Sequence, residues 1–467
     1  MNCRTPFRSQ ETVAAGLIGT GAFGNSFLSQ SRSIPRLQVI GVCDLDLDAA
    51  RAACLRAGWP EEALVSCTTE AEAARAHDAN KVVLVEDSSL LMDLPMHVLV
   101  EATGSPEAGA AHAQDALAHG IHVVMVTKET DCVVGPILSR IAQERGLVYT
   151  QADGDQPSML IGLISWAQAL GLDVICAGKA SEMDVVYDVA FGTVGNRKAA
   201  VDVEAGGHWP LWAAPAARIR EIVAERTRML SPLGEAAVAD LCEMAIVMNA
   251  TGFGYDNPAL HAPIVRINEL ADIWGLRDEG GILAGNGVID VVNCLRREDG
   301  VSFAGGVFVV FACKDRSTWE FLRAKGHVVS QDLSRAAVFL PYHFLGVQTA
   351  NSIFSAVDLG LPTGSMNSLP RVDLGIVAAE PLAAGRALTM SRDHVLAGTR
   401  PILVPARPMG PGQTIPYYLA AGHVLTQDVS SGTVLTYDHV APGSATPLWE
   451  LRRRQDNELG TESAPAT

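Results

Sequence analysis

The chain has 467 residues and a formal net charge of −17, so the phosphates of nucleic acids and anionic membrane surfaces would repel it. With 48% hydrophobic and 19% charged residues it is expected to be globular with a large core, divided by its length into about three domains. No apolar run reaches the ~20 residues of a membrane-spanning helix. Nine scattered cysteines without a C-x-x-C pair predict reduced thiols in a cytoplasmic protein, and residues 1–10 lack the apolar core of a signal peptide.

A glycine-rich loop follows the first predicted strand, Val13–Ile18. Its glycines, Gly19, Gly21 and Gly24, form a G-x-G-x-x-G pattern ahead of a predicted helix. In such a unit the first glycine permits a tight turn, the second lets the backbone approach a pyrophosphate, and the third allows close helix–strand packing. Free N–H groups at the helix N-terminus then bind phosphate oxygens. The alternative is a glycine-rich turn in an unrelated α/β unit. We predict a dinucleotide site here that includes Thr20, Ala22 and Phe23.

The second predicted strand, Leu37–Cys43, ends at Asp44. A carboxylate at this position accepts hydrogen bonds from the adenosine ribose and repels a ribose 2′-phosphate, which favours NAD over NADP. Arg51, in a predicted helix over 47–57, can weaken that preference and keeps NADP open. A solvated aspartate at a helix N-cap is the competing interpretation of Asp44.

Predicted strands and helices continue to alternate through the first third of the chain. Strands are expected at 96–103, 122–126 and 147–150, with helices at 107–118 and 135–145; residues 82–85 fit either a strand or a buried helical turn. The alternation predicts a parallel sheet with right-handed crossovers, the Rossmann arrangement. Because ligands bind outside the carboxyl ends of such strands, Gly19, Asp44, Thr103 and Thr127 are expected to border one crevice.

Two of these strand ends carry candidates for the reaction site. The small residues at Thr103 and Gly104 allow the backbone to approach the nicotinamide side of a dinucleotide. Lys128 follows the next strand, where a partly desolvated ammonium would stabilise a developing alkoxide, and Glu129 is expected to hold it in position. An ordinary strand-to-helix turn and a surface ion pair at a helix start are the structural alternatives.

The middle region adds three further candidates. Asp155 precedes a predicted helix over 158–170 that Ser158 is expected to cap, so Asp155 would lie near a domain boundary. Lys179 follows a predicted strand over 173–177 and is a second cation for the substrate oxygen. His343 follows an apolar strand over 336–340, with Tyr342 beside it, and suits proton transfer near neutral pH. Helix capping, an exposed loop lysine and a structural histidine are the respective alternatives.

Other features of the middle and C-terminal regions are weaker signals. His261 is a minor candidate, and no His or Cys cluster has metal-ligand spacing, so no metal site is predicted. A helix over 231–248 and a buried strand over 306–312 are expected in a mixed α+β region. The similar stretches 377–389 and 419–436 have short apolar runs divided by glycine turns, which predicts small β-rich structure. Residues 455–467 are expected to form a solvated tail.

These motifs, taken in order, resemble the homoserine dehydrogenase-like oxidoreductases with a C-terminal SAF domain. Within that group the chain is similar to the deoxyxylulose-phosphate reductoisomerase-like (DRL) branch. A repeated Ala-x-Gly-x-x-Leu-Thr phrase around Gly385 and Gly422 carries the SAF resemblance. The remaining matches are Gly19–Gly24, Ala102–Gly104, Gly154–Ser158, Ala177–Lys179, Asn249–Gly252, Gly280–Leu283, Gly306–Val310 and Pro341–His343.

The resemblance implies an α/β protein with an N-terminal Rossmann domain at 1–155, a central α+β catalytic and dimerisation domain at 156–370, a small β-rich SAF domain at 371–450 and a tail at 451–467. It further implies a homo-oligomer and hydride transfer at a hydroxyl or carbonyl carbon of a small-molecule substrate. It assigns Lys179 and His343 to the substrate pocket.

Three positions depart from the DRL branch. That branch uses NADPH and lacks an acid at the position of Asp44. An arginine precedes its Pro-Tyr-His motif, whereas Leu340 stands here, which disfavours a phosphorylated substrate. Lys128 matches the wider dehydrogenase group instead.

The expected function is therefore an NAD(P)-dependent dehydrogenase for a small polar hydroxy or keto compound, such as a sugar acid or polyol derivative. The alternatives are a reductoisomerase or oxidoisomerase that couples redox chemistry to skeletal rearrangement, and a non-catalytic dinucleotide-sensing or assembly protein.

Overall fold

The computed structural model describes residues 11–203, 209–233, 236–441 and 445–460. Residues 1–10, where no signal peptide is expected, and residues 461–467 of the expected tail lie outside this part. The chain forms two compact units. The described residues of the first unit lie within 11–158, 344–400 and 406–460, and those of the second lie within 159–343 and 401–405.

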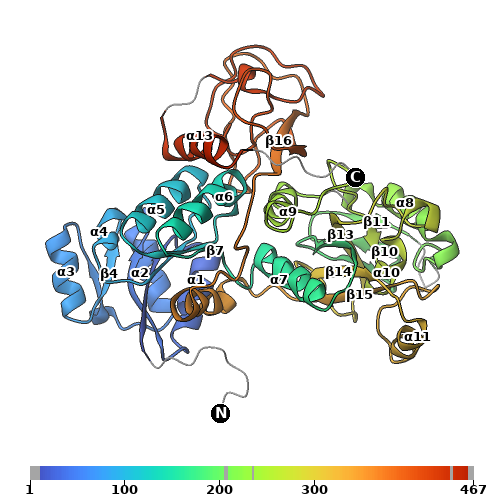
Figure 1. Cartoon of the computed structure of the whole chain (residues 1–467), viewed down its shortest axis with the longest axis horizontal. Coiled ribbons are helices and arrows are strands. Elements are labelled where there is room, and N and C mark those ends of the chain that lie inside the picture. Colours follow the sequence, from blue (N-terminus) through green and yellow to red (C-terminus); the bar gives the residue numbers. More distant parts are fainter. Residues whose placement is uncertain (1–10, 204–208, 234–235, 442–444, 461–467) are drawn as a thin grey trace. The chain divides into compact units, whose positions relative to one another are not determined.

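The first unit is built on a seven-stranded parallel sheet with the strand order β3-β4-β2-β1-β5-β6-β7 (Figure 1). The expected parallel sheet is thereby confirmed. Because β1 lies between β2 and β5, the strand order reverses beside it, and this is where ligands bind in open α/β sheets. The strands are β1 (Val13–Ile18), β2 (Leu37–Cys43), β3 (Leu64–Ser66), β4 (Val82–Val85), β5 (Val98–Glu101), β6 (His122–Met125) and β7 (Tyr149–Gln151).

Side-chain caps fix where several helices of this unit begin. Asp46 accepts from Ala49 N, and Ser105 accepts from Ala108 N with a proline at the first helical position. The helices are α1 (Ala22–Ser31), α2 (Leu47–Arg56), α3 (Glu70–Asp78), α4 (Ser89–Met92), α5 (Pro106–Ala118) and α6 (Lys128–Glu144).

Helix α6 begins seven residues before its predicted start at Gly135. Gly135 and Pro136 look like helix breakers in the sequence, yet both lie inside the helix and are buried. A side chain at Gly135 would place its Cβ 2.0 Å from Asp131 Oδ1, so close packing explains this glycine. The earlier start puts Lys128 and Glu129 in the first turn of α6.

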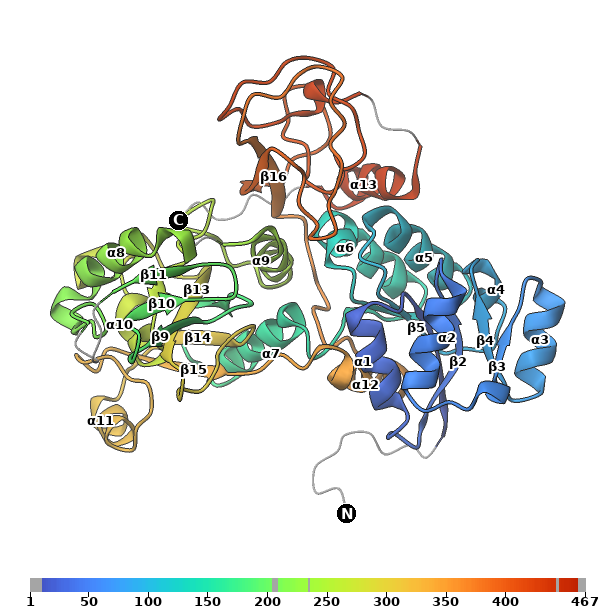
Figure 2. The same cartoon turned by 180° about the vertical axis from the view of Figure 1, so that it is seen from behind.

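The C-terminal part of the first unit is a small β-rich assembly that contains β16 (Val372–Ala378) and the first two residues of β17 (Thr399–Pro405) (Figure 2). Its two similar stretches pair with each other through the antiparallel bridges Leu382↔Val429 and Ala387↔Val424. Helix α13 (Pro447–Glu458) packs on α5 and α6. Its Gln455 is 1% exposed, so the expectation of a solvated tail from this residue onward is wrong.

The second unit holds a mixed sheet in the order β11-β10-β9-β13-β8-β14-β15, and the short strand β12 (Ile264–Val265) pairs with β13. Its central strand, β13, was not predicted, although the apolar run from Val288 was available as a signal. The predicted helix over 231–248 is wrong at its start, because α9 begins at Val238. The strands are β8 (Val174–Ala180), β9 (Val185–Asp188), β10 (Thr193–Gly195), β11 (Ala200–Asp202), β13 (Val288–Arg297), β14 (Val307–Ala312) and β15 (Arg335–Leu340). The longer helices are α7 (Gln156–Ala169), α8 (Ile219–Met229), α9 (Val238–Thr251) and α11 (Arg316–Ala324).

The cysteines and helices of the described residues agree with two expectations from composition. All eight described cysteines are free thiols and seven of them are buried. Burial raises the pKa of the Cys54 thiol to about 11, which keeps it protonated near neutral pH. Among the helices in the described part of the chain, none is long and apolar enough to cross a bilayer.

Candidate functional site

The predicted crevice lies in the first unit at the carboxyl ends of β1, β2 and β5. It is a cavity of about 300 Å³. Thr127 does not line this cavity, but its hydroxyl accepts a hydrogen bond from Gly104 N at 3.0 Å and ties the end of β6 to the end of β5. The lining residues include Gly19, Thr20, Gly21, Asp44, Thr103 and His112.

The three glycines of the loop occupy different environments. Gly19 has φ +94°, and a Cβ there would lie 2.4 Å from the carbonyl oxygen of Ala102. A Cβ on Gly24 would lie 2.2 Å from Gly19 O, whereas one on Gly21 would meet nothing within 4 Å. Gly19 therefore serves the turn and Gly24 serves packing, while Gly21 leaves open space in which a pyrophosphate fits.

The side chains between the glycines divide into two groups. Thr20 lines the cavity, and Ala22 opens helix α1 at the surface. The side chain of Phe23 packs against the hydrophobic core beside the sheet and so anchors the loop to that core.

Asp44 is bound to the glycine-rich loop. One of its carboxylate oxygens accepts from Thr20 N at 2.8 Å and from the Thr20 hydroxyl at 2.6 Å. Arg51, the residue that could weaken a preference for NAD, bonds to Glu61 at 2.6 Å and to Ser66 at 2.8 Å. The guanidinium of Arg51 is thus held by these two groups, whereas the carboxylate of Asp44 lines the cavity.

The turn after β5 forms the opposite end of the crevice. Thr103 donates its hydroxyl to Glu101 at 2.7 Å, and His112 bonds to the same carboxylate oxygen at 3.2 Å. Glu101 is fully buried, and its other oxygen has no hydrogen-bond partner. Gly104 adopts φ +69°, a left-handed conformation that favours glycine.

Lys128 and Glu129 open helix α6 close to this turn. Lys128 is half-buried, and Glu129 is 2% exposed. Oε1 of Glu129 lies 2.6 Å from Nδ1 of His394, a residue of the C-terminal part of the unit. That Glu129 also holds Lys128 in position stays a prediction. His394 was not among the predicted site residues, and nothing in its local sequence distinguishes it.

Asp155 and Ser158 lie at the start of α7. Asp155 accepts a hydrogen bond from the N–H of the next residue at 3.1 Å. Ser158 is the third residue of α7 and is buried, with its hydroxyl donating to Thr363 O at 3.3 Å. The expectation that Ser158 caps this helix is therefore wrong.

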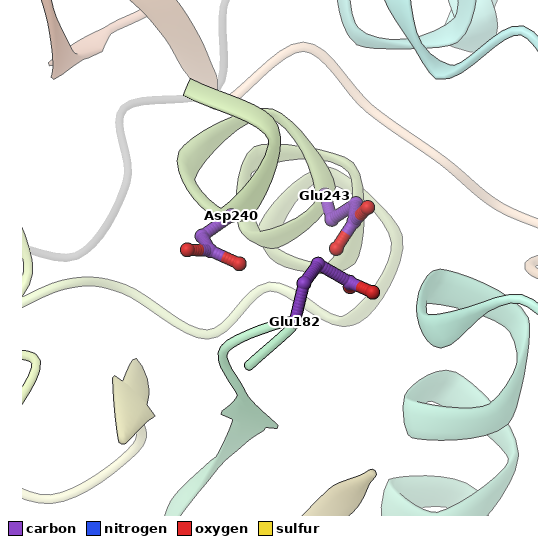
Figure 3. A group of neighbouring side chains, drawn as sticks. All are labelled: Glu182, Asp240 and Glu243. Carbon is purple, nitrogen blue, oxygen red and sulfur yellow. The ribbon is translucent and has the colours of Figure 1, made fainter. Parts of the chain in front are cut away.

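Lys179 lies inside β8 and is fully buried, so the alternative of an exposed loop lysine is wrong. Its ammonium contacts three carboxylates, those of Glu182 at 2.9 Å, Asp240 at 2.9 Å and Glu243 at 2.5 Å. Asp240 and Glu243 are one turn apart on α9, while Glu182 follows β8 (Figure 3). Burial alone lowers the pKa of Lys179, but Asp240, Glu243 and Glu182 outweigh it and the pKa rises, so this side chain stays charged.

The three carboxylates offer oxygens that all lie within 4.8 Å of one another, close enough to share a cation. The ammonium of Lys179 already contacts all three, so the cluster is neutralised in part by the chain's own charge. Burial alone raises the pKa of Glu182, but Lys179 and His343 together outweigh it and hold this pKa well below its usual range.

Glu182 joins this cluster to two other features of the second unit. His343 Nδ1 lies 3.8 Å from Glu182 Oε2, so the two predicted residues Lys179 and His343 flank one carboxylate. Glu182 also lines a cavity of about 480 Å³ whose wall includes Asp184, Asn196 and Arg296. The side chains that reach this cavity are mostly polar, which suits a small hydrophilic ligand.

His261 is held between two aspartates in the second unit. Its Nδ1 lies 2.6 Å from Asp290 Oδ2, and its Nε2 lies 3.3 Å from Asp256 Oδ2. Burial lowers the pKa of His261, but the hydrogen bond and charge of Asp290 outweigh it, so the imidazolium is favoured. Its neighbours Leu260 and Ala262 both have positive φ, at 60° and 44°.

The parallel sheet and the glycine-rich crevice define a nicotinamide-dinucleotide-binding unit. Residues 15–132 match the family model of the homoserine dehydrogenase NAD-binding domain, and residues 218–349 match that of the catalytic domain of oxidoreductase DRL. The chain is thus similar to a homoserine dehydrogenase NAD-binding domain over the first segment and to the DRL catalytic domain over the second, the two likenesses that the motifs predicted. No curated protein matches the chain significantly.

Solved structures with detectable similarity are distant. An oxidoreductase domain protein from Kribbella flavida shares 19% identity over 39% of this chain and 46% of its own, with a TM-score of 0.29. A putative myo-inositol dehydrogenase from Sinorhizobium meliloti shares 11% over 75% and 90%, with a TM-score of 0.36. KijD10, a 3-ketoreductase from Actinomadura kijaniata solved with NADP, shares 15% over 37% and 49%, with a TM-score of 0.26. The chain thus spans about half the length of the first of these structures.

Proposed function

We propose that the chain is an NAD-dependent oxidoreductase that moves a hydride between the cofactor and an oxygen-bearing carbon of a small polar hydroxy or keto compound. A sugar acid or polyol derivative fits this description. The observation that carries the proposal is the crevice at the β1, β2 and β5 ends, where Gly21 leaves open space and Asp44 lines the cavity. Bound NAD would supply the hydride acceptor, or the donor in its reduced form.

The chain's own residues would bind and orient the reactants. Backbone N–H groups at the start of α1 bind the pyrophosphate, and Asp44 binds the adenosine ribose. Lys128, half-buried at the start of α6, steadies the substrate oxygen as negative charge develops on it. Asp155 and His343 are the proposed proton carriers.

Lys179 takes a supporting part in this proposal. Its ammonium is fully buried between carboxylates, so it acts on a ligand through Glu182, whose side chain is 48% exposed. A fixed positive charge behind Glu182 keeps that carboxylate ionised and oriented toward the 480 Å³ cavity. A polar substrate with hydroxyl groups suits the hydrogen-bonding character of this wall.

A second candidate is a reductoisomerase or oxidoisomerase that also rearranges the carbon skeleton. The match of residues 218–349 to the DRL catalytic domain favours it. Product NMR separates the two candidates, because an unrearranged skeleton across all active substrates removes the second one.

A thermal-shift screen tests the substrate class. Sugar acids, polyols and polyol phosphates are added to the full chain with NAD present, since a ligand that binds the folded state raises its unfolding temperature. Each compound that stabilises the protein is then tested for NADH formation at 340 nm. Stabilisation without any NADH change would support the alternative of a dinucleotide-sensing protein.

A further inference from the structure

His394 connects the C-terminal part of the first unit to the β5–α5 turn. Its ring lies against Gly104, because a Cβ placed on Gly104 would be 2.8 Å from its Cε1 and 3.3 Å from its Nε2. Gly104 is also one of the residues predicted to meet the nicotinamide half of the dinucleotide. Gly104 lies between Thr103 and Ser105, which both line the cavity, and its lack of a side chain makes room for the imidazole.

A buried carboxylate orients this imidazole. Glu129 Oε1 lies 2.6 Å from His394 Nδ1, and the side chains of His394 and Glu129 are 31% and 3% exposed. With Nδ1 turned to Glu129, the Cε1–Nε2 edge of the ring is the edge beside Gly104. A carboxylate at Nδ1 with Nε2 presented outward is the arrangement in which histidine exchanges protons with a ligand.

The backbone at His394 is held in an unfavourable conformation. His394 has φ +61°, in the left-handed region that costs energy for residues with a side chain. Three hydrogen bonds fix the segment around it, from His394 N to Ser391 O, from Val395 N to Ser391 Oγ and from Leu396 N to Tyr417 Oη. The neighbouring structure thus maintains a strained histidine beside Gly104.

Three charged groups act on the imidazole of His394. The hydrogen bond and charge of Glu129 raise the pKa of His394, and the charge of Asp393 also raises it. Burial and the charge of Lys128 lower this pKa, and the net direction is upward. The imidazolium is therefore present below a pKa that lies above the ordinary value for histidine and is lost as the pH rises through it.

We propose that the Glu129–His394 pair lines the nicotinamide end of the dinucleotide site, so that the balance between NAD⁺ and NADH binding depends on the protonation of His394. The inference rests on the proposed function, because it requires a dinucleotide in the crevice. The nicotinamide ring is cationic in NAD⁺ and neutral in NADH. An imidazolium beside it repels the oxidised ring and leaves the reduced ring almost unaffected.

The test measures the dissociation constants of NAD⁺, NADH and ADP for the full chain between pH 9 and pH 6. ADP probes the adenosine half alone and shows whether that half of the site is intact. For the unsubstituted chain, the ratio of the NAD⁺ constant to the NADH constant should rise on the order of tenfold as the pH falls. In His394→Gln the ratio should stay constant with pH while ADP binds as before.

Two further variants sharpen the result. Glu129→Gln should lower the pH at which the ratio of the two dissociation constants changes, because the carboxylate that stabilises the imidazolium is gone. His119→Gln is the matched control, since His119 also faces a carboxylate, Asp115 at 3.2 Å, but lies at the far end of α5. It should reproduce the unsubstituted chain.

The inference would be overturned if the ratio of the NAD⁺ and NADH constants depended on pH in the same way in the unsubstituted chain, His394→Gln and Glu129→Gln. The proposed function would then still stand. Failure of the unsubstituted chain to bind NAD⁺, NADH or NADPH would instead overturn the proposed function itself. If His394→Gln does not fold, the shift of the step in Glu129→Gln decides the question.

Discussion

The crevice of the first unit and the charged cluster of the second differ in what their polar groups bond to. In the crevice Gly21 has open space where a side chain would stand, and Asp44 is only partly buried. In the cluster the ammonium of Lys179 is enclosed by three carboxylates and has no exposed surface. One site leaves room for a large external ligand, and the other satisfies most of its charge internally.

This difference separates what each unit contributes. A crevice built from glycine and backbone N–H groups is complementary to a pyrophosphate before the ligand arrives. A buried ion cluster is instead part of the folded structure, and of its three carboxylates only that of Glu182 lines the 480 Å³ cavity. Substitutions should therefore affect binding in the first unit and stability in the second.

The largest effect is expected for Lys179→Met. Removing the ammonium leaves Asp240 and Glu243 buried without a counter-charge, which should lower the free energy of unfolding by about 3–5 kcal/mol. At low pH, protonation of those two carboxylates removes their unpaired buried charge. The loss of unfolding free energy should therefore grow as the pH rises. Chemical denaturation at pH 5.5 and pH 8 measures both the loss of stability and its dependence on pH. The control is Lys314→Met, which breaks an exposed pair with Asp173 and should leave stability unchanged; equal losses in both variants would refute the distinction.

Alanine at two glycines of the loop should separate binding from stability. Gly24→Ala forces a Cβ to within 2.2 Å of Gly19 O, so it should lower both NADH affinity, by roughly 100-fold, and the unfolding temperature. A Cβ at Gly21 would meet no protein atom, so Gly21→Ala should leave the unfolding temperature unchanged. Its methyl group would stand in the space proposed for the pyrophosphate, so this variant should bind NADH more weakly. Calorimetric titration and thermal unfolding of both variants provide the measurement. Intact NADH binding by Gly21→Ala would show that the pyrophosphate lies elsewhere.

A smaller effect is expected for Asp44→Ala. Loss of the ribose contact should weaken NADH binding about tenfold, and removal of the negative charge should bring the NADPH affinity closer to that of NADH. Asp48→Ala, a nearby exposed acid in the first turn of α2, serves as the control. An unchanged NADH-to-NADPH ratio in Asp44→Ala would mean that Asp44 acts only through its bonds to Thr20.

Much of the first unit could be predicted because its signals are local. The strand Leu37–Cys43 and the start of helix α2 at Leu47 follow directly from apolar runs, a capping aspartate and glycine turns. Helix α6 could not be bounded this way, because the packing of Gly135 against Asp131 is a consequence of the folded helix. Strand β13 pairs with β8 and with β9, and no local pattern in the sequence indicates these two pairings.

The site was predictable only where its residues are adjacent in the chain. The loop from Gly19 to Gly24 and Asp44 carry a recognisable spacing. The carboxylates around Lys179 come from two segments some sixty positions apart, and His394 lies 265 positions from its partner Glu129, so no local pattern reports these pairs. Such contacts arise from tertiary packing of polar side chains, which one sequence does not encode in its periodicity.

The most direct test of the account is dinucleotide binding by the unsubstituted full chain. Titration with NADH, followed by the enhancement and blue shift of its fluorescence, should show saturable binding that NAD⁺ and ADP displace, with NADPH weaker than NADH. Absence of binding by both NADH and NADPH at millimolar concentration would contradict the assignment of the crevice and with it the proposed oxidoreductase activity.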